Sequence, residues 1–257
     1  MLYDKLIFPK RTLTVILLSM LSMGFLSVTA ARKKPVQKIK VACIGNSITY
    51  GTGIQDREHF SYPVQLQKML GDKYLVGNFG KPGATLLNHG HRPYMQQEEY
   101  RQAMAFKGDI AVIHLGINDT DPRNWPNYRD EFVKDYLSLM DSLRSANPKV
   151  RFILACMTPI AHRHPRFISG TKQWHDEIQE AIKVVARVSG AELIDFHAPL
   201  YPYPNLLPDA IHPNAEGAGI LAKTVYGGIT GNYGGLQLSD LYTDDMVLQR
   251  NVPLDIH

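Results

Sequence analysis

An apolar run that ends in a glycine and a serine, Ile39-Lys40-Val41-Ala42-Cys43-Ile44-Gly45-Asn46-Ser47-Ile48-Thr49, sets the expectation for the whole chain. The segment 39–44 predicts a strand that is buried on both faces, as in a parallel sheet covered by helices. Ser47 follows the apolar end of this strand. A turn there would lift its hydroxyl over the edge of the sheet, where a following helix N-terminus favours developing negative charge. Taken alone, the serine is more typical of a helix cap than of a catalytic residue.

Strand-like and helix-like segments alternate along the rest of the chain. Further strands are expected at 74–78, 109–115, 150–157 and 191–196, and helices at 60–70, 128–146, 172–188 and 215–229. Repeated β-α units with right-handed crossovers predict a three-layer α/β/α sandwich around a five-stranded parallel sheet. We expect the flavodoxin-like strand order 2-1-3-4-5, with the site at the carboxyl ends of the strands, near the switch between the first and third.

Two later motifs supply what acyl transfer to a serine needs. They are Gly116-Ile117-Asn118-Asp119, directly after a predicted strand, and Asp209-Ala210-Ile211-His212, directly before a predicted helix. Ser47 is the candidate nucleophile, His212 its base, and Asp209 the group that orients the base. Either motif alone is a common turn or exposed loop, but together and in this order they favour a catalytic site.

An oxyanion hole needs several converging donors. The candidates are the backbone N–H of Ser47, the backbone N–H of Gly83 and the side-chain amide of Asn118. Glycine at position 83 would let the backbone approach a substrate closely, although it also suits an ordinary turn. We expect Asp119 to hold its loop in place rather than take part in the chemistry.

These blocks resemble those of the GDSL-type, or SGNH, hydrolases over about residues 38–230. The resemblance implies a serine esterase that uses no cofactor. Carried over by motif, it assigns nucleophile, base and partner to Ser47, His212 and Asp209, and the oxyanion hole to Ser47, Gly83 and Asn118. The first block departs from the family pattern, since Gly-Asn-Ser-Ile replaces Gly-Asp-Ser-Leu. The chain has no Gly-x-Ser-x-Gly elbow, which argues against the α/β-hydrolase fold.

Residues 1–30 have the pattern of a secretory signal peptide. Lys5, Lys10 and Arg11 precede an apolar run over 13–26, and small residues follow at 28–30. The alternative is an uncleaved anchor, but the run is shorter than the roughly 20 residues that a spanning helix prefers. We therefore expect export to the periplasm or exterior of a bacterium, with no membrane insertion after signal removal.

The chain of 257 residues leaves one domain at 31–230 once this segment is set aside. Its formal charge falls from +4 to about +2, so nothing points to nucleic acid as a partner. Cys43 and Cys156 fall in predicted buried strands that one strand separates, about 9–10 Å apart, which is too far for a disulfide. We expect two buried free thiols.

The last residues, 231–257, are expected to form a Gly-rich linker and the truncated opening of a second domain. The segment from Leu241 to Pro253 resembles the opening of sialate O-acetylesterase-type domains. This short similarity implies a longer parent protein with two esterase modules acting on acetylated sugars.

The sequence as a whole predicts an exported serine esterase that removes a short acyl group, most simply acetyl, from a carbohydrate. The following residues are candidates for substrate binding: Trp125, His162, His164, Tyr201 and Tyr203. Plain surface packing is an equal alternative for the three aromatic side chains. The histidine pairs His162/His164 and His89/His91 lack carboxylates at ligand spacing, so no metal is expected.

Two other functions stay open at this point. A lysophospholipase or thioesterase on the same fold would prefer long acyl chains, although the chain has no long apolar lid segment. A non-catalytic carbohydrate-binding module would bind sugar equally well after Ser47→Ala and would turn over no ester.

Overall fold

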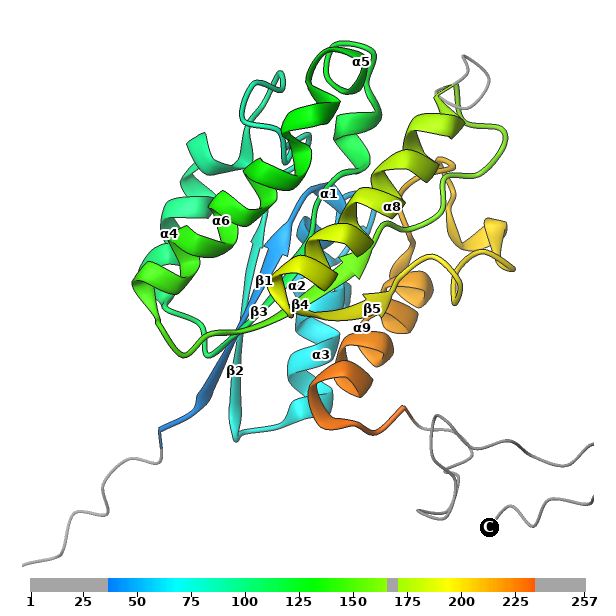
Figure 1. Ribbon diagram of the computed structural model, residues 1–257. Helices are drawn as coiled ribbons and strands as arrows, with labels where there is room; N and C mark the ends of the chain where they lie inside the picture. The colour runs from blue at the N-terminus through cyan, green and yellow to red at the C-terminus, as the bar shows by residue number, and fades with distance from the viewer. Residues whose placement is uncertain (1–36, 166–170, 234–257) are drawn as a thin grey trace, which may run out of the picture. The chain divides into compact units, whose positions relative to one another are not determined.

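A computed structural model describes residues 37–165 and 171–233 of the chain (Figure 1). The predicted signal peptide, and residues 234–257 of the predicted linker and second domain, lie outside this described part. Five parallel strands form one sheet with the order β2-β1-β3-β4-β5. Their bounds are β1 Ile39–Gly45, β2 Tyr74–Gly80, β3 Ile110–His114, β4 Arg151–Cys156 and β5 Glu192–Asp195. The predicted sheet and strand order are confirmed.

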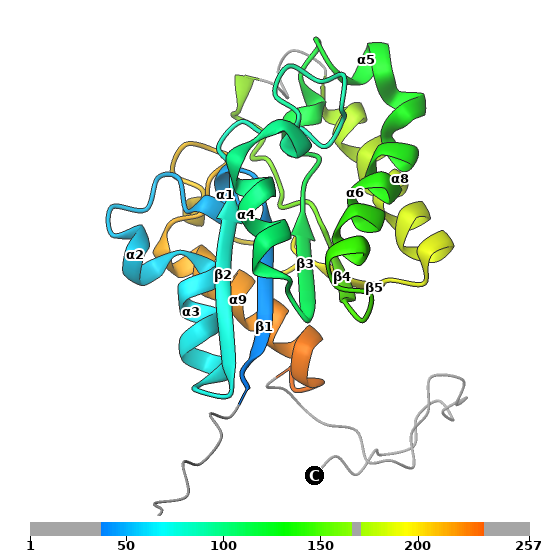
Figure 2. The same cartoon turned by 90° about the vertical axis from the view of Figure 1, so that its left-hand side faces the viewer.

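Helices cover both faces of the sheet (Figures 1 and 2). One face carries α3 and α9, and the other carries α4, α6 and α8. The helix bounds are α1 Ser47–Tyr50, α2 Arg57–Phe60, α3 Tyr62–Leu70, α4 Glu98–Phe106, α5 Trp125–Tyr128, α6 Phe132–Ala146, α8 Lys172–Ser189 and α9 Ala215–Thr230. Short 3-10 turns lie at Tyr94–Gln96 (η1), Ile117–Thr120 (η2), Arg129–Glu131 (η3) and Pro204–Leu206 (η4). The predicted three-layer sandwich is confirmed.

Some predicted helix limits are wrong. The helix expected over 60–70 begins at Tyr62, because Ser61 is extended and separates it from α2. The helix expected over 128–146 begins at Phe132, after α5 and η3. The helix α4 was not expected, since Ala103 is its single fully buried residue and the apolar stripe is correspondingly weak.

The core lies between the sheet and its two helical layers. Every residue of β3 is buried, as is every residue of β4 after Arg151, which explains their continuous apolar sequence. Cys43 on β1 and Cys156 on β4 are buried free thiols, with β3 between their strands, as predicted. Within the described part of the chain, none of the helices combines the length and apolar character needed to cross a bilayer.

Candidate active site

Ser47 is the first residue of α1, directly past the end of β1, which lies between β2 and β3 in the sheet. The Asn46 side chain caps this short helix by accepting a hydrogen bond of 3.0 Å from the Ile48 N–H. Gly45 has no room for a side chain, since a Cβ there would lie 2.1 Å from the Thr49 hydroxyl oxygen and 2.7 Å from the His114 carbonyl oxygen. This close approach allows the sharp turn that places Ser47 above the strand ends.

A line of hydrogen bonds joins Ser47 to His212 and Asp209. His212 Nε2 lies 2.8 Å from Ser47 Oγ, and His212 Nδ1 lies 2.6 Å from Asp209 Oδ2. A carboxylate acceptor at Nδ1 fixes the tautomer with its proton on that atom. The lone pair of Nε2 therefore faces the serine hydroxyl, as a general base requires.

Asp209 holds both the ring and the backbone of its own loop. Its Oδ1 accepts from the N–H groups of Ile211 and His212, at 3.0 and 2.7 Å. Partial burial acts to raise the pKa of Asp209, but the hydrogen bonds from His212 and Ile211 outweigh it and leave that pKa below its usual value. The carboxylate consequently stays ionised next to the imidazole at neutral pH.

Ala210, which lies between Asp209 and Ile211, has a left-handed backbone conformation with a φ of 74°. This conformation costs a non-glycine residue about 1–2 kcal/mol. Two backbone hydrogen bonds of 2.8 Å hold it: the Ala210 N–H donates to Leu207, and its carbonyl accepts from Ala161. These two bonds hold Ala210 in its left-handed conformation and so fix the course of the loop that carries His212.

The candidate oxyanion donors come from three segments that are bonded to one another. Asn118 Nδ2 donates to the Ala84 carbonyl at 2.9 Å, which uses one of its two N–H groups. The Lys81 N–H in turn donates to the Gly45 carbonyl at 2.9 Å. The N–H of Ser47 opens α1 and so has no partner within that helix. The predicted donors Ser47, Gly83 and Asn118 therefore lie on neighbouring segments at one edge of the sheet.

Gly83 has a φ of +77°, a region that glycine enters without cost. A Cβ at this position would lie 3.1 Å from Nη1 of Arg92, so the guanidinium group covers this side of the turn. Glycine thus meets a conformational requirement here.

The carboxylate of Asp119 joins the loop that carries Asn118 to the segment that follows Gly83. It is fully buried, and its oxygens accept from the N–H groups of Leu86 and Leu87, each at 2.9 Å. Burial raises the pKa of Asp119 to about 7, against the opposing effect of these hydrogen bonds. Asp119 holds its loop, as expected, and positions it against the segment that follows Gly83.

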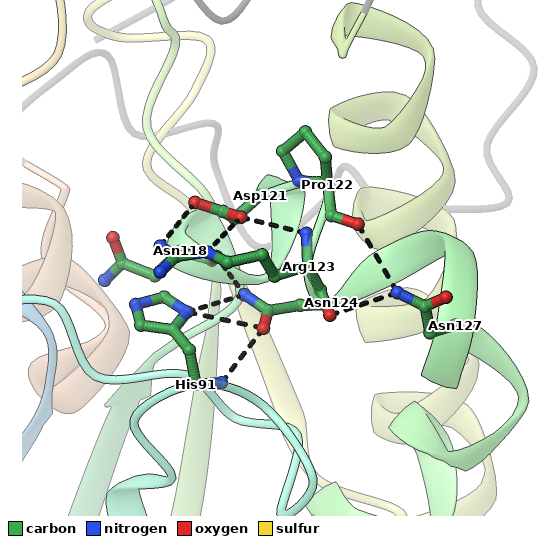
Figure 3. A network of polar contacts seen from close by, with 7 residues as sticks. All are labelled: His91, Asn118, Asp121, Pro122, Arg123, Asn124 and Asn127. Carbon is green, nitrogen blue, oxygen red and sulfur yellow. Dashed lines mark hydrogen bonds and ion pairs between the residues drawn. The ribbon is translucent and has the colours of Figure 1, made fainter.

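Asn124, which none of the sequence motifs indicated, also joins the Asn118 loop to a neighbouring segment (Figure 3). Its Nδ2 donates to the Asn118 carbonyl at 2.9 Å, and its Oδ1 accepts from the His91 N–H at 3.0 Å. Asn124 is fully buried although it lies in a polar loop. Its closeness to the Asn118 motif is the one signal that could have identified it.

The candidate substrate-binding residues separate into three groups. The prediction for Trp125 is wrong: the side chain is 3% exposed, packs edge-on against Phe132 and donates to Glu177, so it offers no face to a sugar. His162 and Tyr201 line one cavity of about 410 Å³. His164 and Tyr203 do not line this cavity.

No group of three or more histidine, cysteine, aspartate or glutamate side chains is arranged to hold a metal ion among residues 37–165 and 171–233. His89, one of the histidines singled out by the sequence, pairs with Glu131 at 2.7 Å.

Comparison with known proteins identifies relatives of the chain. A model of the GDSL-like lipase/acylhydrolase family matches residues 43–220. An acetylxylan esterase from Xylanibacter ruminicola is 41% identical over 204 aligned residues, and the match covers 73% of this chain and 42% of that protein. The chain thus spans less than half the length of this curated relative.

Solved structures with this fold include two esterases. The carbohydrate acetylesterase Est24 from Sinorhizobium meliloti superposes with a TM-score of 0.57 at 19% identity, covering 76% of this chain and 99% of that one. The acetyl xylan esterase AlAXEase gives a TM-score of 0.57 at 20% identity, covering 74% and 100%. At these identities the similarity establishes the fold.

Proposed function

The chain belongs to the GDSL-like lipase/acylhydrolase family of carboxylic ester hydrolases, and from that premise we propose that it removes short acyl groups, acetyl above all, from a carbohydrate. Ser47, His212 and Asp209 are the proposed catalytic triad. The observation that carries the proposal is the continuous hydrogen-bonded line from the serine hydroxyl through the imidazole to the carboxylate. This arrangement is what activates a serine that is otherwise a weak nucleophile.

In the first step, Ser47 Oγ attacks the carbonyl carbon of the ester while His212 Nε2 takes the hydroxyl proton. The charge that develops on the carbonyl oxygen is stabilised by the N–H groups of Ser47 and Gly83 and by the second N–H of the Asn118 amide. His212 then gives its proton to the departing sugar oxygen. An acetyl group remains on Ser47.

In the second step, His212 accepts a proton from water as the water attacks the acetyl-enzyme. The proton returns to Ser47 Oγ as acetate leaves. Asp209 stabilises the imidazolium that forms in each step, since its lowered pKa keeps it ionised.

The preference for acetylated carbohydrate is supported by the acetylxylan esterase from Xylanibacter ruminicola, which is 41% identical. Export to the periplasm or cell exterior is supported by the basic and apolar pattern of residues 1–30. The resemblance of residues 241–253 to a sialate O-acetylesterase-type domain supports a second esterase module in a longer parent protein.

The proposal is tested by measuring acetate release from acetylated xylo-, manno- and galacturono-oligosaccharides, together with p-nitrophenyl esters of rising chain length. The variants are Ser47→Ala and, as a matched control, Ser145→Ala on the exposed face of α6. We expect wild type and Ser145→Ala to release acetate and to favour short acyl chains, and Ser47→Ala to be inactive. Preference for long acyl chains would replace this function with a lysophospholipase or thioesterase. Sugar binding without turnover would indicate a binding module.

A further inference from the structure

We infer that the cavity lined by Tyr201 and His162 is a subsite for a sugar ring on the alcohol side of the scissile ester. The inference rests on the proposed function and names which part of the substrate this region recognises. The cavity measures about 410 Å³, which is within the range of small-molecule sites and large enough for a pyranose ring.

The cavity has the composition of a sugar site. The buried part of its lining is apolar and consists of Ile160, Ala161 and Leu207. The exposed part includes His162, Arg163 and Tyr201, which offer a ring nitrogen, a guanidinium group and a phenol for hydrogen bonds to hydroxyls. An apolar surface with a few polar groups at its edge matches the two-sided character of a sugar ring.

The Tyr201 ring is held in place by its neighbour His197, so that a sugar ring can stack on it. Its ring stacks on that of His197, with centroids 5.2 Å apart and an interplanar angle of 22°. The Tyr201 N–H also donates to the His197 carbonyl at 2.9 Å. One face of the phenol is therefore supported from behind, while the side chain as a whole stays 59% exposed. A platform held in this way loses little conformational entropy when a ligand stacks on it.

The walls of the cavity are fastened to the loop that carries His212. Ala161 donates its N–H to the Ala210 carbonyl, and Leu207 accepts from the Ala210 N–H, both at 2.8 Å. The Arg163 guanidinium also donates to the Leu207 carbonyl, which joins the two walls directly. The cavity and the Asp209–His212 loop consequently form one connected unit.

This position assigns the cavity to the alcohol part of the substrate. His212 must protonate the departing sugar oxygen, so the leaving group lies on the His212 side of the ester. The candidate oxyanion donors Gly83 and Asn118 belong to other segments, which follow β2 and β3. We therefore expect a sugar chain that leaves past His212 to reach the segments of Ala161 and Leu207, which Ala210 joins to the His212 loop.

The test compares Tyr201→Ala with wild type on two kinds of ester. We expect KM for the best-hydrolysed acetylated oligosaccharide to rise roughly 3- to 10-fold, as the loss of an aromatic contact predicts. We expect kcat for that substrate, and both constants for ethyl acetate, to stay unchanged, because ethanol is too small to reach the cavity. Tyr201→Phe keeps the ring but loses the phenol hydroxyl, so it should raise KM for the oligosaccharide less than Tyr201→Ala does. Tyr233→Ala replaces an exposed tyrosine at the end of the described chain and serves as the control.

The inference would be overturned if Tyr201→Ala changed KM equally for both esters, or if it left KM for the oligosaccharide unchanged. Either result would leave the esterase proposal standing. Calorimetric titration of the unacetylated oligosaccharides into wild type and Tyr201→Ala separates the two claims further. Binding that Tyr201→Ala weakens, in a protein that hydrolyses no ester, would support the subsite and reject the esterase. Equal binding by both proteins would reject the subsite.

Discussion

His212 Nε2 lies 2.8 Å from Ser47 Oγ although the two residues are 165 positions apart in the chain. Ser47 follows β1, an inner strand of the sheet, and His212 lies in the chain between the edge strand β5 and α9. The carboxyl ends of parallel strands meet at one edge of a sheet, which brings the two residues together. The site therefore exists only when β1 and β5 are both in place.

Asp209→Asn should lower kcat on the order of 10³- to 10⁴-fold. Asparagine can still accept from the N–H groups of Ile211 and His212, so the loop should keep its shape. What is lost is the carboxylate opposite His212 Nδ1. Steady-state kinetics on an acetyl ester and a thermal melt of the same sample check this. A nearly unchanged kcat would mean that the imidazole does not depend on Asp209.

Asn118→Ala should reduce kcat about 10²- to 10³-fold with little change in KM, as expected for a donor that acts mainly in the transition state. Asn127→Ala, in the nearby loop, is the matched control, because its amide bonds only the Pro122 and Arg123 carbonyls among the described residues. If the two variants lost equal activity, Asn118 would have no special role in the oxyanion hole.

Asp119→Asn tests the hydrogen bonds that join the Asn118 loop to the segment that follows Gly83. One of the two carboxylate acceptors is replaced by an N–H₂ group that faces the N–H of Leu86 or Leu87. An unsatisfied buried donor costs about 1–3 kcal/mol, so urea denaturation should show a loss of this size. We expect kcat to fall as well, since Gly83 and Asn118 lie on the loops that lose the tie. Wild-type stability together with wild-type kcat would contradict this role.

His114 should make the protein less stable in acid. It is fully buried, and burial together with the nearby His175 lowers its pKa from 6.5 to about 3. Because this folded-state pKa lies below the unfolded value, its contribution is complete above about pH 6.5 and is lost as the pH falls towards 3. The titration of His114 should therefore lower the free energy of unfolding by up to about 1.4 kcal/mol for each unit by which the pH falls.

His114→Gln isolates this effect. Glutamine can accept from the Thr158 N–H as His114 Nε2 does, but it takes up no proton. Asp119, with its pKa raised to about 7, contributes a slope of opposite sign in both proteins and cancels in the comparison. Denaturant titrations between pH 4 and 7 should give a shallower acid slope for the variant. Parallel curves would show that His114 does not titrate with unfolding.

The inner strands β1, β3 and β4 were predictable because each is a short, mostly apolar run that two helical layers cover. The helix α4 was not, since it lies at the surface and buries little beyond Ala103. The break at Ser61 was missed as well, because an extended serine between two helical segments leaves no trace in the apolar pattern.

The candidate triad could be located from the sequence because its three members fall in two short motifs, one directly after β1 and one directly before α9. The supporting residues could not. Asn124 reaches Asn118 and His91 through contacts that only the folded loops create. Trp125 has the side chain of a sugar platform, but its ring packs on Phe132 in the core, and burial of a loop residue depends on tertiary packing.

The most direct test of the account is covalent labelling with a fluorophosphonate, followed by peptide mapping. A serine activated by His212 should take up one phosphonyl group on the peptide that contains Ser47, and ester hydrolysis should fall in proportion to the labelled fraction. Ser47→Ala should take up none, and His212→Gln should label far more slowly than wild type. Stoichiometric labelling elsewhere with loss of activity, or ester hydrolysis that persists in Ser47→Ala, would contradict the assignment of Ser47 as the nucleophile.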